Sequence, residues 1–319
     1  MKRIGVLTSG GDAPGMNAAI RAVVRQGIAL NMEVYGIQRG YEGLLDGDIE
    51  KMESYSVGDI LQRGGTMLRT ARSKRFLEDK WIDHAAKMLE TFGIEGLVVI
   101  GGEGSFKGGN ELSKRGVKVM GVPGTIDNDL GYTDYSIGFD TAVNTILGLI
   151  TNIRDTSSSH ERSTIIEVMG RNCGDLALYA GLAGGADVIM IPEVDMDIKE
   201  VCRRVLRGQR SGKAHSLILK AEGVQMDAAE LAKVLEEMTS REARTVVPGY
   251  IQRGGSPTEA DRRLASQTAA KAVQLLYDDT PSRAIGVQEG QIISVELAKA
   301  IEMKREFRRD IYELAEILA

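Results

Sequence analysis

Three short loops carry the side chains whose types and spacing could do chemistry. Each follows an apolar run, and they occupy residues 9–12 (SGGD), 101–105 (GGEGS) and 124–129 (GTIDND). Backbone N–H groups at the start of a helix attract phosphate, and glycine lets a phosphate come close to them. Carboxylates in the same place would repel a phosphate unless a divalent cation lies between. Glu103, Asp127 and Asp129 therefore indicate Mg²⁺-nucleotide chemistry.

Each loop also has a purely structural interpretation. A Gly-Gly pair makes a strand-to-helix turn, and an aspartate caps a helix N-terminus. One loop alone fits this structural interpretation well. Three such loops that together carry three acidic residues favour a Mg²⁺-nucleotide site instead. Known signatures are missing, since GxGxxG, GxxxxGK[ST], HRD, DFG, GxSxG and HExxH do not occur. A dehydrogenase, a P-loop NTPase, a protein kinase, a serine hydrolase and a zincin lose support.

Arginines in expected loops are a second group of candidate functional residues. They are Arg72, Arg162, Arg171 and Arg253, with Arg244 at the start of an apolar run. A guanidinium matches phosphate in a bidentate manner, so arginines beside glycines suggest anion binding. Ordinary surface solvation is the alternative, and it stays open here even for Arg171 and Arg253.

A third cluster begins with Arg21 and Arg25, which are one helical turn apart. Arg154 and the turn 213–215 could join them in space. Exposed helix charges with no common ligand are the alternative that this spacing leaves open.

Alternating strands and helices must position these groups. Apolar runs predict strands at 4–8, 33–38, 96–100, 117–122, 163–169, 187–191, 216–222 and 245–252, and helices are expected at 16–30, from 105 to about 114, at 139–155 and at 307–318. Several runs are apolar throughout, as in parallel strands covered on both faces. The fold class is therefore α/β, with mainly parallel sheets flanked by helices.

Composition narrows the function classes. A length of 319 residues suits two domains or one large α/β unit. The 40 Lys and Arg against 45 Asp and Glu leave a net charge of −5, which argues against a broad basic surface for nucleic acid. The two cysteines, Cys173 and Cys202, lack metal-site spacing. No apolar run suits a signal peptide or a membrane span, so a soluble cytoplasmic protein without a membrane or nucleic-acid partner is expected.

The motifs, taken in order, resemble those of one family. LTSGGDAPGMNAAIR, RGGT, VVIGGEGS, PGTIDND, GFDTAVNT, HERS, EVMGR, AEG and QRGGSPTEADR run across the whole chain. This collinear set is similar to the bacterial ATP-dependent 6-phosphofructokinases. The resemblance implies two α/β domains with the active site in the cleft between them. The larger, ATP-binding domain would comprise residues 1–138 and 256–304, and the smaller, fructose 6-phosphate-binding domain residues 139–255 and 305–319.

The resemblance also implies the reaction and the residue roles. ATP would phosphorylate the 1-hydroxyl of D-fructose 6-phosphate in glycolysis, with Asp127 as general base and Mg²⁺ near Glu103 and Asp129. The catalytic positions are Asp127, Arg171, Thr125 and Gly11. The ATP-binding positions are Gly11, Arg72, Ser73, Gly102, Glu103, Gly104 and Ser105. The sugar-binding positions are Thr125, Ile126, Asp127, Arg162, Met169, Gly170, Arg171, Glu222, Arg244, Tyr250 and Arg253.

In the family, the residues matching Arg162 and Arg244 come from a neighbouring subunit, so a homotetramer with shared sites is implied. An effector site for ADP or phosphoenolpyruvate is implied as well. Its positions are Arg21, Arg25, Ser54, Asp59, Arg154, Gly185, Asp187, Ser211, Lys213 and His215.

Departures from the family pattern refine these expectations. Glu103 stands where an Asp is usual, and Tyr250 stands where bacterial relatives usually have His. Asp187 replaces a common Glu, and Ser54 and Ser211 replace common basic residues, which predicts weakened allosteric control. Pyrophosphate-using relatives usually carry Asp at position 104 and Lys at position 124, and glycine at both positions here favours ATP. A pyrophosphate-dependent enzyme and a non-catalytic nucleotide sensor remain the alternatives.

Overall fold

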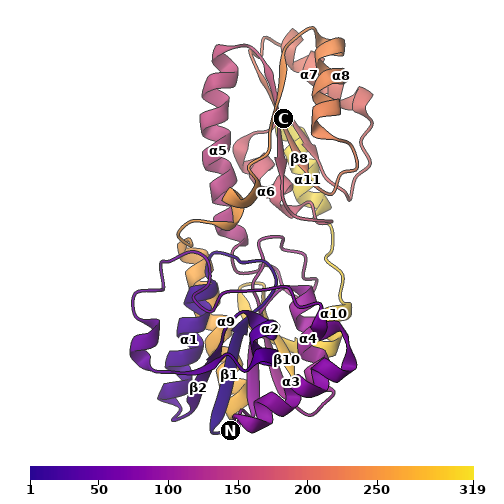
Figure 1. Cartoon of the computed structure of the whole chain (residues 1–319). Coiled ribbons are helices and arrows are strands. Elements are labelled where there is room, and N and C mark those ends of the chain that lie inside the picture. The colour runs from indigo at the N-terminus through magenta and orange to yellow at the C-terminus, as the bar shows by residue number, and fades with distance from the viewer. The chain divides into compact units, whose positions relative to one another are not determined.

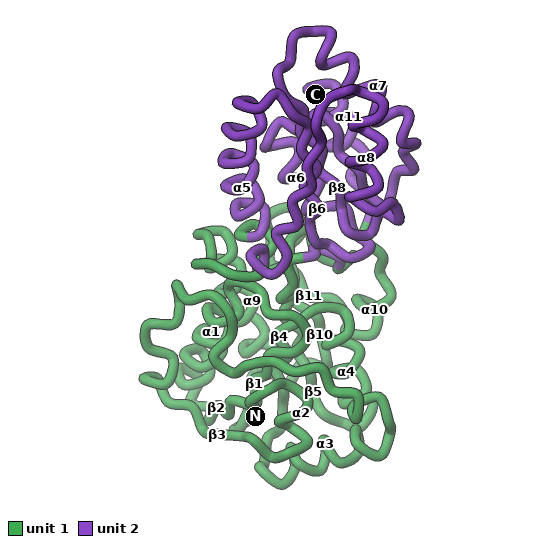
Figure 2. The backbone as a smooth tube through the Cα atoms, turned by 45° about the horizontal axis from the view of Figure 1, so that its top comes forward, with its two compact units in different colours: residues 1–126, 130–141, 253–305 green, residues 127–129, 142–252, 306–319 purple.

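The chain forms two compact units. The computed structural model describes residues 1–319. Unit 1 comprises Met1–Ile126, Leu130–Thr141 and Arg253–Arg305, and unit 2 comprises Asp127–Asp129, Ala142–Gln252 and Glu306–Ala319 (Figure 2). The domains that the family resemblance implies differ from these units at four places: they assign residues 127–129 to the larger domain, and residues 139–141, 253–255 and 305 to the smaller one. Residues 127–129 belong to unit 2 because their side chains bond there, Asp127 to Arg171 and Asn128 to Asp175.

Unit 1 is built on a seven-stranded sheet. Its strands run in the order β11–β10–β5–β4–β1–β2–β3. The five inner strands are parallel, and the edge strands β3 and β11 are antiparallel to their neighbours. The bounds are β1 Arg3–Thr8, β2 Glu33–Ile37, β3 Ile49–Met52, β4 Gly96–Gly101, β5 Lys118–Pro123, β10 Arg283–Gln288 and β11 Gln291–Glu296.

Helices cover both faces of this sheet (Figure 1). One face carries α1 (Met16–Ala29) and α9 (Glu259–Tyr277). The other carries α2 (Gly40–Asp46), α3 (Asp79–Thr91), α4 (Glu103–Ser113) and α10 (Leu297–Glu302). Strand β4 is buried along its whole length, which explains why its sequence is apolar throughout rather than alternating.

Unit 2 contains a four-stranded parallel sheet in the order β7–β8–β6–β9. Its strands are β6 (Ser163–Val168), β7 (Val188–Met190), β8 (Ser216–Ala221) and β9 (Ala243–Val246). The helices α7 (Ile198–Arg210) and α8 (Ala228–Thr239) pack on one face around Ile165, Ile218 and Leu231. The helix α6 (Asp175–Gly184) packs against α11 (Arg309–Leu318) and against α5 (Phe139–Ser159).

Most predicted strands and helices are present, which confirms the fold class. The predicted strand 245–252 is wrong beyond its first two residues. Strand β9 ends at Val246, and Gly249–Arg253 forms the short 3₁₀ helix η3. Pro248 lies between them and has no amide hydrogen to continue a ladder. Two further 3₁₀ helices are η1 (Ser54–Val57) and η2 (Arg75–Leu77).

None of the helices combines the length and the apolar character that crossing a membrane requires.

Candidate functional site

The three glycine-rich loops lie side by side in unit 1. Strands β1, β4 and β5 are neighbours and parallel, so their carboxyl ends meet at one edge of the sheet. The Ser9 amide donates to the Ile100 carbonyl at 3.0 Å, and the Gly124 amide donates to the Gly101 carbonyl at 3.0 Å. Ligands of parallel sheets collect at such an edge. The structure thus places the loops where the sequence analysis expected a ligand.

Two glycines in these loops make close contacts, and the contact of Gly101 with backbone requires glycine. A Cβ at Gly11 would overlap the guanidinium of Arg253, whose Nη1 donates to the Asp12 carbonyl at 3.2 Å. A Cβ at Gly101 would lie 2.5 Å from the Ser9 carbonyl oxygen. Two predicted site residues, Gly11 and Arg253, are therefore brought together within unit 1.

The loop after β4 leads directly into α4. Ser105 and Phe106 donate their amides to the Gly102 carbonyl, so the helix starts at the predicted phosphate position. A Cβ at Gly104 would meet nothing within 4 Å, so open space adjoins this residue. The Glu103 carboxylate pairs with Lys107 at 2.5 Å on the exposed side of α4.

The segment that carries Arg72 is tied to the first loop. Thr70 Oγ1 donates to the Gly10 carbonyl at 2.8 Å, which fixes the chain two residues before Arg72. Ser73 Oγ accepts a hydrogen bond from the Phe76 amide at 3.1 Å, and the Arg72 side chain is exposed. The predicted ATP-binding residues of this segment thus lie beside the glycine-rich edge.

Hydrogen bonds of its backbone hold the third loop in place. The Thr125 amide donates to the Ile137 carbonyl at 3.1 Å, and Ser136 Oγ donates to the Thr125 carbonyl at 2.7 Å. Ile126 is fully buried. No part of Ile126 is therefore exposed for the predicted contact.

In unit 2 the predicted general base meets a guanidinium. Asp127 is 1% exposed, and its Oδ2 lies 3.2 Å from Arg171 Nε. Arg171 has a left-handed backbone with φ 54°, and its amide donates to Glu222 Oε1 at 2.7 Å. Its side chain is 53% exposed, so the guanidinium stays open to a ligand while it pairs with Asp127. A base beside a cation that can hold an anion suits phosphoryl transfer.

A small cavity in unit 2 collects three of the predicted sugar contacts. It has a volume of about 200 Å³ and is lined by Glu167, Val168, Met169, Glu222, Val247, Gly249, Tyr250 and Gln252. The Met169 amide donates to Gln252 Oε1 at 3.0 Å, and Gln252 Nε2 donates to the Gly249 carbonyl at 3.1 Å. The fully buried Gln252 thereby holds β6 against η3. The sequence analysis missed Gln252, although it is the first residue of the motif QRGGSPTEADR.

The two arginines expected to serve a neighbouring subunit lie next to each other. Thr164 of β6 is in register with Arg244 of β9. Arg162 Nη1 is 4.0 Å from Glu242 Oε2, and Arg244 pairs with the other oxygen of the same carboxylate. The Arg244 side chain is 63% exposed and available to another chain.

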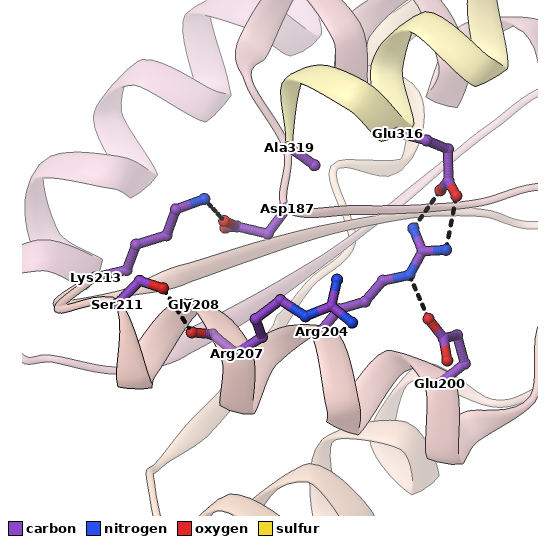
Figure 3. Close-up of a pocket in the computed structure, with 9 residues that line it drawn as sticks. All are labelled: Asp187, Glu200, Arg204, Arg207, Gly208, Ser211, Lys213, Glu316 and Ala319. Atoms are coloured by element: carbon purple, nitrogen blue, oxygen red, sulfur yellow. Dashed lines mark hydrogen bonds and ion pairs between the residues drawn. The ribbon is translucent and has the colours of Figure 1, made fainter.

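A second cavity, of about 240 Å³, collects part of the predicted effector site (Figure 3). Lys213 Nζ pairs with Asp187 Oδ1 at 2.6 Å, and Ser211 lies on the same wall. Nearby, Arg154 Nη2 donates to the Gly185 carbonyl at 3.1 Å. The remaining predicted effector residue of unit 2, His215, is half-buried just before β8 and does not line this cavity.

Sequence reasoning missed four charged residues of this cavity. Arg204 donates to Glu200 on its own helix and to both oxygens of Glu316 on α11 (Figure 3). Arg207 lines the same cavity. The basic run RRVLRGQR on α7 was a signal for Arg204 and Arg207, but not for Glu200 or Glu316.

The other predicted effector and metal positions divide between the units. Unit 1 contains Arg21 and Arg25 on α1, Ser54 at the start of η1, exposed Asp59 and Glu103. Unit 2 contains Asp129, which is half-buried.

A buried carboxylate anchors one of the recognised motifs in unit 1. Asp261 of α9 accepts hydrogen bonds from the Gly138 amide at 2.8 Å, the Thr141 amide at 2.8 Å and Thr141 Oγ1 at 2.5 Å. Burial raises the pKa of Asp261 to about 6, while these hydrogen bonds act against the rise.

Comparison with known proteins identifies the family. The family model described as Phosphofructokinase matches residues 3–276. The chain is 56% identical to the ATP-dependent 6-phosphofructokinases of Clostridium botulinum (strain Loch Maree / Type A3) and Clostridium acetobutylicum, over all 319 residues and the whole of both relatives. It superposes on phosphofructokinase from Saccharomyces cerevisiae with a TM-score of 0.91 at 35% identity, covering all of this chain and 48% of the yeast chain. The chain belongs to the phosphofructokinase family.

Proposed function

We propose that this chain is an ATP-dependent 6-phosphofructokinase, which transfers the terminal phosphoryl group of ATP to the 1-hydroxyl of D-fructose 6-phosphate. The names of the full-length relatives at 56% identity support the activity. The structural observation that carries it is the buried Asp127 carboxylate held 3.2 Å from the open Arg171 guanidinium. A buried base next to a partly exposed cation matches an alcohol acceptor next to a phosphoryl group.

The chemical step follows from these groups. The sugar 1-hydroxyl oxygen forms a bond to the γ-phosphorus as the bond from that phosphorus to the bridging oxygen of ADP breaks. Asp127 accepts the hydroxyl proton. Arg171 and the Gly11 amide stabilise charge on the transferring group, and positioning and charge neutralisation do most of the work in such reactions.

Glu103 and Asp129 are the proposed metal-holding residues. Carboxylate oxygens are the donors that Mg²⁺ prefers, so each of these two side chains would supply a ligand of the right chemistry. Mg²⁺ neutralises the nucleotide phosphates when it is bound. Lys107 pairs with Glu103 at 2.5 Å and competes with a metal for this carboxylate.

A homotetramer is the proposed assembly, in which Arg162 and Arg244 hold the sugar 6-phosphate of a neighbouring subunit. Their convergence on Glu242 supports a shared role, and the exposure of Arg244 leaves it free to cross to another chain. The cytoplasm remains the predicted location.

Effector control is proposed to be present but weak. In the cavity of Figure 3 the Lys213 charge is taken up by Asp187, and Ser211 offers only a hydroxyl. Fewer free cations mean less binding energy for an anionic effector, and coupling cannot exceed the difference in that energy between two states.

A direct assay separates this function from its nearest rival, a pyrophosphate-dependent enzyme. Fructose 6-phosphate turnover is measured with ATP and, in parallel, with pyrophosphate as donor. The open space next to Gly104 favours the bulkier nucleotide. The proposal would be rejected if the enzyme turned over with pyrophosphate but not with ATP, or if it turned over with neither donor.

A further inference from the structure

Lys220 is a buried charge that the proposed reaction does not yet use. It lies near the end of β8, whose other residues are mostly apolar, and its side chain is 2% exposed. Its Nζ is 2.9 Å from Glu167 Oε2 and 3.4 Å from the Ala221 carbonyl. Glu167 stands opposite it in the register of β6 and β8. A lysine is almost never buried without a partner, so the two residues act as a pair.

The pair lies between the apolar core of unit 2 and the sugar cavity. Side chains two residues apart share one face of a strand. On this face, the first layer is Ile165 beside Ile218, which belongs to the core under α7 and α8. Glu167 beside Lys220 forms the next layer.

The layer beyond it consists of predicted sugar contacts. Met169 and Glu222 come directly after the ends of β6 and β8, and both line the cavity. Glu167 lines the same cavity, with its side chain 26% exposed, whereas Lys220 stays behind it. The Glu167 carboxylate is thus shared between a buried ammonium and the space where the sugar would bind.

The Lys220–Glu167 pair has a role other than stabilising the fold, because it controls the charge at the cavity wall. An apolar pair of similar volume is often as stable as a buried ion pair, so stability alone does not call for Lys220. The cavity already has a carboxylate at Glu222, which accepts from the Arg171 amide. A second carboxylate without a counter-charge would repel an anionic sugar phosphate.

On the basis of the proposed function, we propose that Lys220 is a positioning residue for the sugar phosphate. Its ammonium neutralises and orients Glu167 at the cavity wall, so that the cavity accepts an anionic sugar. Lys220 itself does not touch the substrate.

Four variants of the full-length protein test this role: Lys220→Met, Glu167→Gln, the double variant, and Lys233→Met as a matched loss of an exposed lysine on α8. The KM values for fructose 6-phosphate and ATP, kcat, the Kd of fructose 6-phosphate by calorimetry and the thermal midpoint are measured. Lys220→Met should raise the KM and Kd for fructose 6-phosphate about tenfold, with KM for ATP and kcat within about twofold. The double variant should restore both values to within about threefold of wild type.

The outcomes are distinguishable. Unchanged sugar affinity in Lys220→Met, or an equal loss in the single and double variants, would overturn the role of Lys220. If Lys220→Met does not fold, Glu167→Gln tests the inference instead. This variant leaves a buried cation beside the cavity, so it should bind the sugar phosphate more tightly. Weaker binding in Glu167→Gln would then reject the inference. Wild-type protein that binds the sugar but does not turn over with ATP would reject the proposed function, while the Kd series would still test Lys220.

Discussion

Asp127 shows how one side chain gains a chemical role from its neighbours. The carboxylate is almost fully buried, yet a guanidinium lies 3.2 Å away on a residue that is itself half exposed. Arg171 has a left-handed backbone, and a hydrogen bond from its amide to Glu222 holds that backbone in place. Backbone strain of this kind is common at functional residues.

Replacing Asp127 with serine tests its role as the base. The Asp127→Ser variant should lose about two to four orders of magnitude in kcat, because no group remains to accept the hydroxyl proton. The KM values should change little. Steady-state kinetics with ATP and fructose 6-phosphate provide the measurement, and Asp195→Ser, at an exposed aspartate of unit 2, is the control. Near-normal turnover in Asp127→Ser would show that another group takes the proton.

Gly104 should control the choice of phosphoryl donor. A side chain at this position enters open space, so Gly104→Asp should fold normally. Its carboxylate would repel the nucleotide phosphates, and KM for ATP should rise about tenfold or more. Gly101→Ala is the contrasting variant, since its Cβ would press on the Ser9 carbonyl and lower the thermal midpoint. An unchanged KM for ATP in Gly104→Asp would separate this residue from the ATP site.

At the scale of elements, α9 should make stability depend on pH through Asp261. Its pKa is about 6 in the folded chain and near its ordinary value of about 4 in the unfolded chain, so the folded state binds the proton more tightly. This group therefore stabilises the fold most at low pH, and its contribution is lost as pH rises through about 6.

Asp261→Asn removes that titration. The difference in thermal midpoint, wild type minus variant, should fall between about pH 4 and about pH 7, by the equivalent of at most about 3 kcal/mol. Differential scanning calorimetry of both proteins across this range provides the measurement. A difference that stays constant, or that grows with pH, would contradict the raised pKa.

The sequence predicted inner strands better than edge strands. Strands such as β4 are apolar along their length because helices cover both faces, and this pattern is visible in the residues alone. The edge strands β3 and β11 carry polar and half-exposed residues and pair antiparallel with one neighbour. The sequence of β3, IEKM, differs little from that of a loop. In contrast, β11 (QIISVE) and its inner neighbour β10 (RAIGVQ) contain apolar residues, and the sequence analysis missed both strands.

In the candidate site, too, some features could be predicted from the sequence and others could not. Loops at the ends of β1, β4 and β5 could be predicted because parallel strands bring their carboxyl ends to one edge. Pairs formed across strands, such as Glu167 with Lys220, depend on register and on strand order. Neither quantity can be read from the spacing of the motifs.

At the scale of the whole molecule, weak effector control should be visible in the kinetics. Plots of rate against fructose 6-phosphate should be close to hyperbolic, and phosphoenolpyruvate should inhibit only weakly, since the Lys213 charge is already taken up by Asp187. Rates are measured with and without ADP and phosphoenolpyruvate. Strongly sigmoidal curves would show that the cavity of Figure 3 has more capacity for anions than Ser211 and Lys213 suggest.

The chain passes repeatedly between its two units, and this has a consequence for biosynthesis. Met120 of β5 pairs with Arg283 of β10, so the sheet of unit 1 has an unpaired inner edge until β10 has left the ribosome. The four strands of unit 2 emerge earlier, as one continuous stretch. A nascent chain that stalls in between carries a bare, apolar strand, and such a chain depends on chaperones to avoid aggregation.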